Sequence, residues 1–211
     1  MTGLRHPELL RVAANGGGYF MGGSQEWFPN SWQRKSGCGP TTASGIMWYL
    51  SRSRPELEVL RGGGDGNQKH FLRLMEEMFR FVTPGPQGVN KTSTLSDGAA
   101  GYARSKGIVL RADILDVPPA AFPRPSVQDV REFLSASFAA DCPAAFLNLS
   151  NGTLRNLSSW HWVLLIALEP ASMTATMCDQ CARTGIALGE WLRSTALGGG
   201  FVALALAGET M

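Results

Sequence analysis

Apolar residues follow two different spacings, which divide the chain into a helical first part and a strand-rich second part. In the first part they recur every three or four positions, the spacing of one helical face. The clearest helical run carries the apolar residues Phe71, Leu74, Met75, Met78, Phe79 and Val82. After residue 143, short apolar runs separated by turn residues predict strands at 144–149, 160–168, 173–178 and 201–206.

Further elements are predicted from local signals. Gly39–Pro40 begins a segment with helical apolar spacing, and proline suits the first turn of a helix. Ser126 and Asp129 have the spacing of a capping box, which predicts the start of another helix. A weaker helix is expected at 95–106 and a strand at 108–114. Because helices come first and strands later, the order indicates an α+β protein rather than alternating strands and helices.

The composition is that of an ordinary globular domain. Hydrophobic residues make up 44% of the 211 residues and charged residues 17%, so the chain can fill a core and disorder is excluded. The net charge of +2 gives no reason to expect a nucleic-acid or membrane-surface partner. We therefore expect one domain over residues 1–211, in which residues 1–26 form a loop-like, glycine-containing arm.

The apolar runs are too short to cross a membrane. The longest uncharged ones, 162–168 and 201–207, have strand length, whereas a spanning helix needs about 20 residues. Near the N-terminus, Arg11 interrupts the apolar run 9–14, which excludes the apolar stretch of a signal peptide. These observations predict a cytoplasmic protein, whose cysteines stay reduced.

Cys38 is the cysteine with a chemical reason for its position. It lies between Gly37 and Gly39–Pro40, at the predicted start of a helix. Free N–H groups and the positive end of the helix dipole favour a thiolate there. Four cysteines are too few for a disulfide scaffold in a chain of this length. The alternative is a small buried residue packed at a helix end.

Three other polar residues are candidates for chemistry beside Cys38. His161 begins an apolar strand, where it is held firmly and stays accessible to a substrate. Asp179 ends the next strand, and a β-hairpin would bring its carboxylate beside the histidine to orient it. Gln33 lies five residues before Cys38, where its amide can point toward an oxyanion. Each of them alone more often has an ordinary structural role.

The remaining cysteines and histidines receive no catalytic role from the sequence. Cys178 and Cys181 have the spacing of a redox pair or of half a zinc site, but a second half is missing. We expect them and Cys142 to be ordinary packed thiols. His6 and His70 are expected at the surface.

The run from Trp32 to Ala43, with its Cys38-Gly39-Pro40 helix start, resembles the nucleophile segment of papain-like cysteine peptidases. It is most similar to the bacteriocin-processing branch, which removes double-glycine leaders. That branch combines a glutamine, a Cys-Gly-Pro helix start, a His-x-Val strand and a later strand ending in aspartate, in the order found here. The segments 190–192 and 199–204 also resemble the closing turn and last strand of the family. Here Gln180 follows the aspartate, where the family often has proline.

The resemblance implies a papain-like α+β fold, with the nucleophile helix packed against an antiparallel sheet. It implies Cys38 as nucleophile, His161 as base, Asp179 as the orienting residue and Gln33 as the oxyanion residue. The expected activity is peptide hydrolysis through a thioester on a peptide or protein substrate, with no cofactor and no metal. An acyltransferase or transamidase would use the same residues. A peptide-binding protein on this fold and a thiol-redox or zinc module are the alternatives of other classes.

Overall fold

A seven-stranded antiparallel sheet forms the centre of the computed structural model, which describes residues 1–208. Six strands follow the order β4-β9-β5-β6-β7-β8, and the short β1 pairs with β6. The strands are β1 (Thr2–Gly3), β4 (Leu110–Val117), β5 (Ala144–Asn148), β6 (His161–Glu169), β7 (Thr174–Asp179), β8 (Ala182–Ala187) and β9 (Gly199–Leu206). All neighbours are antiparallel, so the predicted α+β class is confirmed.

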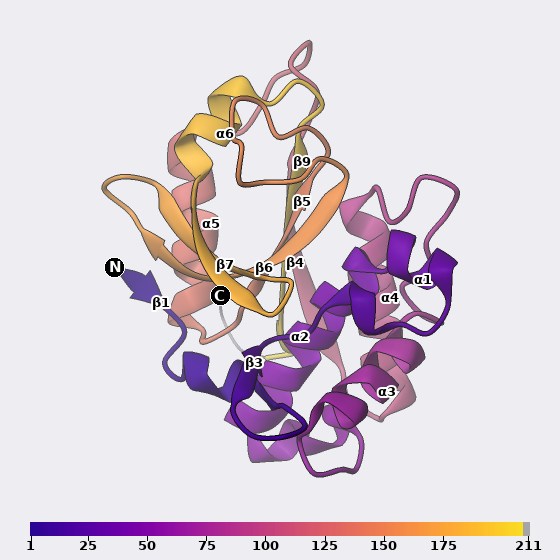
Figure 1. Ribbon diagram of the computed structural model, residues 1–211. Helices are drawn as coiled ribbons and strands as arrows, with labels where there is room; N and C mark the ends of the chain where they lie inside the picture. The colour runs from indigo at the N-terminus through magenta and orange to yellow at the C-terminus, as the bar shows by residue number, and fades with distance from the viewer. Residues whose placement is uncertain (209–211) are drawn as a thin grey trace.

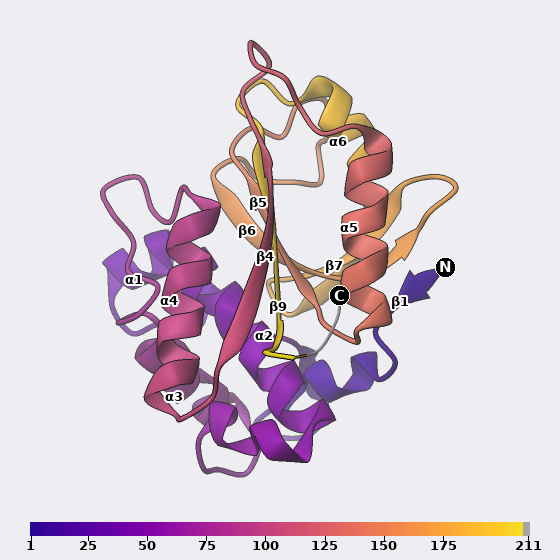
Figure 2. The same ribbon diagram turned by 180° about the vertical axis from the view of Figure 1, so that it is seen from behind.

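Helices cover both faces of this sheet (Figures 1 and 2). The helices are α1 (Ser31–Ser36), α2 (Cys38–Ser53), α3 (Gln68–Met78), α4 (Thr92–Ser105), α5 (Val127–Ala139) and α6 (Leu188–Ser194). In Figure 2, α1 to α4 lie on one side of the sheet and α5 on the other. The helix α2 packs on β5 and β6, while α4 packs on β4 and β9. No helix within residues 1–208 has the length and apolarity needed to cross a bilayer.

The helix α2 is the central element of the core. Nearly all of its residues are buried, including the large side chains of Trp48 and Tyr49. Gly45 lets the helix approach the sheet closely, because a Cβ there would lie 3.0 Å from a methyl group of Leu164 in β6. One contiguous hydrophobic cluster extends from Leu4 to Ala205. The helical part and the sheet therefore share a single core.

Most predicted elements are confirmed. The helix at Gly39–Pro40 is α2, and the four strands after residue 143 are β5, β6, β7 and β9. The capping box at the start of α5 is formed in both directions: Asp129 N–H donates to Ser126 Oγ at 3.1 Å, and Ser126 N–H donates to Asp129 Oδ2 at 2.6 Å. Short-range sequence patterns therefore predicted correctly where these helices and strands lie.

Three elements differ from the prediction. The helix predicted at 71–82 ends at Met78 as α3, because the chain turns before Thr83–Pro84, where proline disfavours helix. The strand β8 was not predicted, since most of its residues are exposed and give no apolar alternation. The helix α1 was also missed, because six residues are too few for a periodic signal.

The sequence predicted a loop-like arm over residues 1–26, and this prediction is wrong. The arm contains β1, the hairpin of β2 (Arg11–Ala13) and β3 (Tyr19–Met21), and short 3-10 turns. Strands of two or three residues are too short to show a period of two, which explains the error. The arm is fastened to the β7–β8 turn, where Met21 N–H donates to Cys181 O at 3.1 Å and Ser24 Oγ donates to Gln180 Oε1. Gly22, Gly23 and Gln25 of the arm line the same cavity as Cys38.

Candidate active site

Cys38 is the first residue of α2 and is 8% exposed. The helices α1 and α2 meet at Gly37, where a Cβ would lie 2.4 Å from Gln33 O and 2.5 Å from the Phe28 ring. Only glycine therefore permits this sharp junction. The helical hydrogen bonds of α2 begin at Thr41, whose N–H donates to Gly37 O at 2.9 Å. The N–H of Cys38 thus has no acceptor within the helix, and the positive end of the dipole favours a thiolate on its side chain.

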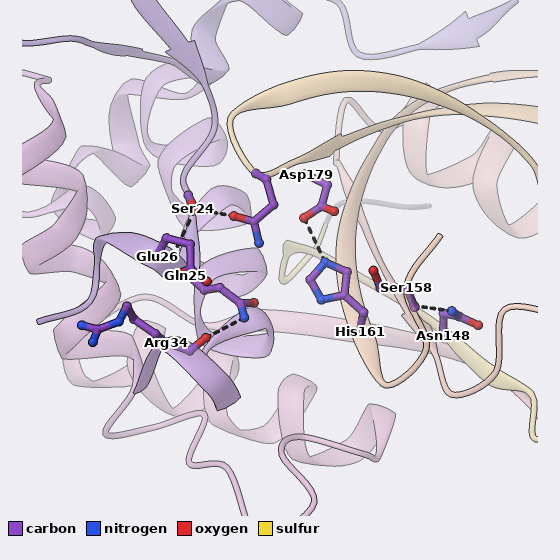
Figure 3. A network of polar contacts seen from close by, with 9 residues as sticks. Ser24, Gln25, Glu26, Arg34, Asn148, Ser158, His161 and Asp179 are labelled. Atoms are coloured by element: carbon purple, nitrogen blue, oxygen red, sulfur yellow. Dashed lines mark hydrogen bonds and ion pairs between the residues drawn. The ribbon is translucent and has the colours of Figure 1, made fainter. Parts of the chain in front are cut away.

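His161 and Asp179 lie at the same end of the sheet, although 18 residues separate them in sequence. His161 begins β6 and Asp179 ends the antiparallel neighbour β7. His161 Nε2 donates to Asp179 Oδ1 at 2.9 Å, as Figure 3 shows. The second ring nitrogen is thereby left for Cys38, which lines the same small cavity as His161. The structure thus brings Cys38, His161 and Asp179 together.

The pKa of His161 is raised well above its ordinary value. Burial by itself lowers the pKa, but hydrogen bonds and charge from Asp179 and Cys38 outweigh it and raise the pKa to about 10. The imidazole is therefore protonated at neutral pH. An imidazolium next to Cys38 stabilises a thiolate on that residue.

A buried amide holds the loop that leads into His161. Asn148 in β5 is opposite His161 in the β5–β6 register and is fully buried. Its Nδ2 donates to Ser158 O at 2.6 Å, and its Oδ1 accepts from Trp191 Nε1 at 2.7 Å. Figure 3 shows the Asn148–Ser158 bond beside the histidine. Every polar atom of this side chain is paired within the fold, so the loop enters β6 in one defined path.

Two cavities of very different size meet at Cys38. The smaller has a volume of about 30 Å³ and is lined by Cys38, His161, Asp179 and Gln25, among others. The larger has a volume of about 400 Å³ and lies on the side of α1. The nucleophile candidate is thus reachable from a groove large enough for a substrate, since ligand pockets span roughly 300–1,000 Å³.

The structure brings Gln25, and not Gln33, to these cavities among the residues it describes. Gln33 lies in α1, about 100° around the helix from Trp32, which does face the larger cavity. Gln25 extends toward His161 in Figure 3, and its Nε2 donates to Arg34 O at 2.6 Å. One N–H of that amide remains for another acceptor. The sequence carried no signal for Gln25, because its place depends on the folded path of the arm.

The other cysteines do not form a second site. None of the four cysteines, all within residues 1–208, forms a disulfide. Cys178 lies in β7 and Cys181 in the two-residue turn to β8, where Gln180 and Cys181 have φ of 45° and 67°. Burial raises the pKa of Cys178 to about 12 and that of Cys181 to about 11. No group of three or more metal-binding side chains exists among the described residues.

Of the two remaining histidines, one was placed correctly from the sequence. His6 is exposed, whereas His70 is buried at 2% exposure. Its Nε2 donates to Arg61 O at 2.8 Å, and its Nδ1 accepts from Gly66 N–H at 3.2 Å. The surface prediction for His70 was wrong because the glycine-rich loop 62–66 folds over the ring.

No protein-family model matches the chain, and a search of curated proteins finds no relative. Among solved structures, the chain is similar to a double-glycine motif protease from an AMS/PCAT transporter, solved in complex with the leader peptide. That match is 16% identical over 81% of this chain and 84% of that chain, with a TM-score of 0.38. A second match is the Pseudomonas avirulence protein AvrPphB, 9% identical over 82% of this chain and 93% of that chain, with a TM-score of 0.36.

Proposed function

We propose that this protein is a cysteine peptidase that uses Cys38 as its nucleophile. The observation that carries the proposal is the convergence of three groups on one cavity: a thiol at a helix N-terminus, a histidine, and a carboxylate bonded to that histidine at 2.9 Å. A nucleophile, a base and an orienting residue are the three parts of a catalytic triad. The sequence resemblance to papain-like peptidases supports the same assignment.

The reaction proceeds through a thioester. The Cys38 thiolate attacks the carbonyl carbon of the scissile bond and forms a tetrahedral intermediate. When the intermediate collapses, the C–N bond breaks and His161 gives its proton to the leaving amine. The neutral His161 then takes a proton from water as that water attacks the thioester. The acid product leaves, and Cys38 and His161 return to the thiolate–imidazolium pair.

The oxyanion needs two donors in this mechanism. The Cys38 backbone N–H, free of helical hydrogen bonds, is one of them. The side-chain donor is a glutamine, and two are candidates. The family resemblance implies Gln33. Gln25 is favoured instead by its position in the lining of the smaller cavity. Removing one oxyanion donor lowers kcat about 10²–10³-fold in other enzymes, so single substitutions distinguish the two.

Thiol labelling across pH tests the nucleophile directly. Iodoacetamide is reacted with the unmodified chain and with the Cys38→Ala and His161→Ala variants, and the labelled cysteines are identified by mass spectrometry. We expect Cys38 to react fastest of the four cysteines, at low pH as well as at neutral pH. His161→Ala should lose the reactivity at low pH. A Cys38 that reacts like a free thiol, or a faster Cys178, would falsify the proposal.

Product analysis separates hydrolysis from acyl transfer. A peptide library is digested with the active chain in the presence and absence of an added primary amine, and products are identified by mass. New carboxyl termini in both conditions support the peptidase. Amide products formed at the expense of carboxyl termini would assign the acyltransferase instead. A reactive Cys38 with no product of either kind would favour a peptide-binding protein.

A further inference from the structure

The larger cavity at Cys38 is a groove with aromatic walls. It has a volume of about 400 Å³ and is lined by Trp32, Lys35, Ser36, Cys38, Trp160 and the turn 86–88. The two tryptophans are 47% and 48% exposed, so large aromatic faces are open to solvent directly beside the nucleophile candidate. Exposed apolar surface gathered in one concavity is typical of a binding site.

The first tryptophan is presented by a well-anchored helix. Trp32, Lys35 and Ser36 have the spacing i, i+3, i+4, so they share the face of α1 that borders the groove. The helix is capped by Asn30, whose Oδ1 accepts from Trp32 N–H at 2.8 Å. Arg34 binds the carbonyls of residues 28 and 29, each at 2.8 Å. The position of Trp32 is therefore fixed before any ligand binds.

The second tryptophan occupies an unfavourable backbone conformation. Trp160 has φ of 55°, which is unusual for a bulky residue and strains the backbone. It immediately precedes His161 and half of its surface is exposed, so burial of its own ring does not account for this conformation. Strain of this kind is found where a side chain must be held in a particular place. Here the strained residue lines the groove.

The turn 86–88 supplies another part of the groove lining. Gly85 and Gly88 exchange two backbone hydrogen bonds of 3.1 and 2.9 Å across Pro86–Gln87. Gly88 has φ of 72°, a conformation that favours glycine. All three walls of the groove are thus fixed by local hydrogen bonds or strain, as expected of a pre-formed site.

Lys35 adds a single charge to the groove. Lys35 is exposed, and it forms no ion pair with any other residue in the range 1–208. No acidic side chain lines the groove. The local charge therefore attracts an acidic group and repels a basic one.

We propose that the groove between Trp32 and Trp160 binds a large apolar or aromatic side chain of the substrate residue next to the scissile bond. Lys35 favours an acidic over a basic residue near it. This inference rests on the proposed function, because Cys38 must be the attacking group for the groove to adjoin the bond. A glycine at that position would leave both indole faces in water, whereas an aromatic ring would cover them.

A cleavage profile tests the inference. A peptide library from a digested proteome is treated with the full chain, and the residues flanking each cut are counted. We expect Phe, Tyr, Trp, Leu or Met to be enriched at one position beside the cut bond, with acidic residues preferred over basic ones near it. The best sequence is then made as a fluorogenic peptide in two forms, one with the aromatic residue and one with glycine.

Matched variants connect the preference to the groove. Trp32→Ala and Trp160→Gly should each lower kcat/KM for the aromatic peptide about tenfold, while the glycine peptide changes less than about twofold. Trp160→Gly also relieves the positive φ, so its thermal stability should not fall. Phe122→Ala is the control, because it removes an aromatic ring that is 62% exposed and lines neither cavity at Cys38. Lys35→Glu should invert the preference for acidic residues.

The failure of this inference differs from the failure of the proposed function. If peptides are cut but glycine is preferred beside the bond, or the tryptophan variants affect both peptides equally, the groove does not select side chains and the inference is overturned. If no peptide is cut and Cys38 reacts like a free thiol, the peptidase proposal itself fails. If peptides are cut with aromatic enrichment beside the bond, and each tryptophan variant abolishes that enrichment, the peptidase proposal and the groove inference are both supported.

Discussion

Cys38 and Cys178 line the same small cavity, yet their surroundings prepare them for opposite behaviour. Their exposures are nearly equal, at 8% and 6%. Cys38 lies at a helix N-terminus and shares the cavity with His161, whereas Cys178 lies within β7, where burial raises its pKa to about 12. Burial alone therefore does not decide which thiol is reactive. Under the proposed function, the neighbouring histidine and the helix dipole make Cys38 the reactive thiol.

Removing each thiol in turn should produce the largest contrast. Cys38→Ala is expected to lower kcat by about 10⁴-fold or more, because no nucleophile remains. Cys178→Ala should retain activity within about twofold, since its thiol is protonated and takes no part in the reaction. Both variants are assayed on the same fluorogenic peptide. A Cys178→Ala variant as inactive as Cys38→Ala would erase the difference between the two thiols.

The proposed oxyanion role distinguishes the two glutamines, because Gln25 lines the small cavity with Cys38 and Gln33 lines neither cavity at Cys38. Gln25→Ala should lower kcat about 10²–10³-fold with little change in KM, whereas Gln33→Ala should change it by less than about threefold. Gln25→Glu serves as a near-isosteric comparison that removes the N–H donor. A larger loss in Gln33→Ala would return the oxyanion role to Gln33.

The third contrast concerns the proton on His161. Because its pKa is raised to about 10, kcat/KM should be constant through neutral pH and lost as pH rises through about 10. Asp179→Asn removes the charge that holds the proton, so this alkaline limb should move down by about one to three units. The rate at neutral pH should fall about tenfold. A limb that does not move would show that Asp179 does not act through His161.

The same raised pKa has a consequence for stability. The ordinary pKa of histidine is 6.5, and His161 reaches about 10 in the fold. Its contribution to stability is therefore fully present below about pH 6.5 and is lost as pH rises through about 10. Urea unfolding at several pH values measures it. His161→Ala should remove that pH dependence, and an unchanged curve would contradict the assignment.

The smallest effect on activity is expected from Cys178→Ser. It places a hydroxyl in a buried strand position, which should lower the free energy of unfolding by about 1–3 kcal/mol. Activity measured well below the melting temperature should stay within about twofold. Together with Cys178→Ala, this variant distinguishes a structural thiol from a chemical one, since a chemical thiol would affect turnover in both.

The sequence was informative wherever the signal was local. The capping box at Ser126 and Asp129 and the helix start at Cys38 both depend on neighbours within four residues. The strands β5, β6 and β9 are buried on both faces, so their apolar runs could be recognised in the sequence. By contrast, β8 is largely exposed and gave no pattern. Whether an element could be predicted from the sequence therefore depended on local capping signals and on burial, and not on its length alone.

The misplaced residues share a different cause. His70 was expected at the surface because the loop that covers it is glycine-rich and has no pattern of its own. Gln25 was overlooked because it lies 13 residues before Cys38, with α1 between them. Its contact with the cavity depends on the bond from Ser24 to Gln180, which lies 156 residues away. Contacts at such separation leave no trace in local sequence.

By itself, the sequence determined the α+β class, the helix that begins at Cys38 and the strands that carry His161 and Asp179. These follow from apolar spacing and helix-start signals, which act over a few residues. Only the tertiary structure decided that Asp179 is within 2.9 Å of His161, that Gln25 rather than Gln33 reaches the cavity, and that Trp32 and Trp160 share one groove. The reason is that each depends on how distant segments pack together, and packing is a property of the whole core.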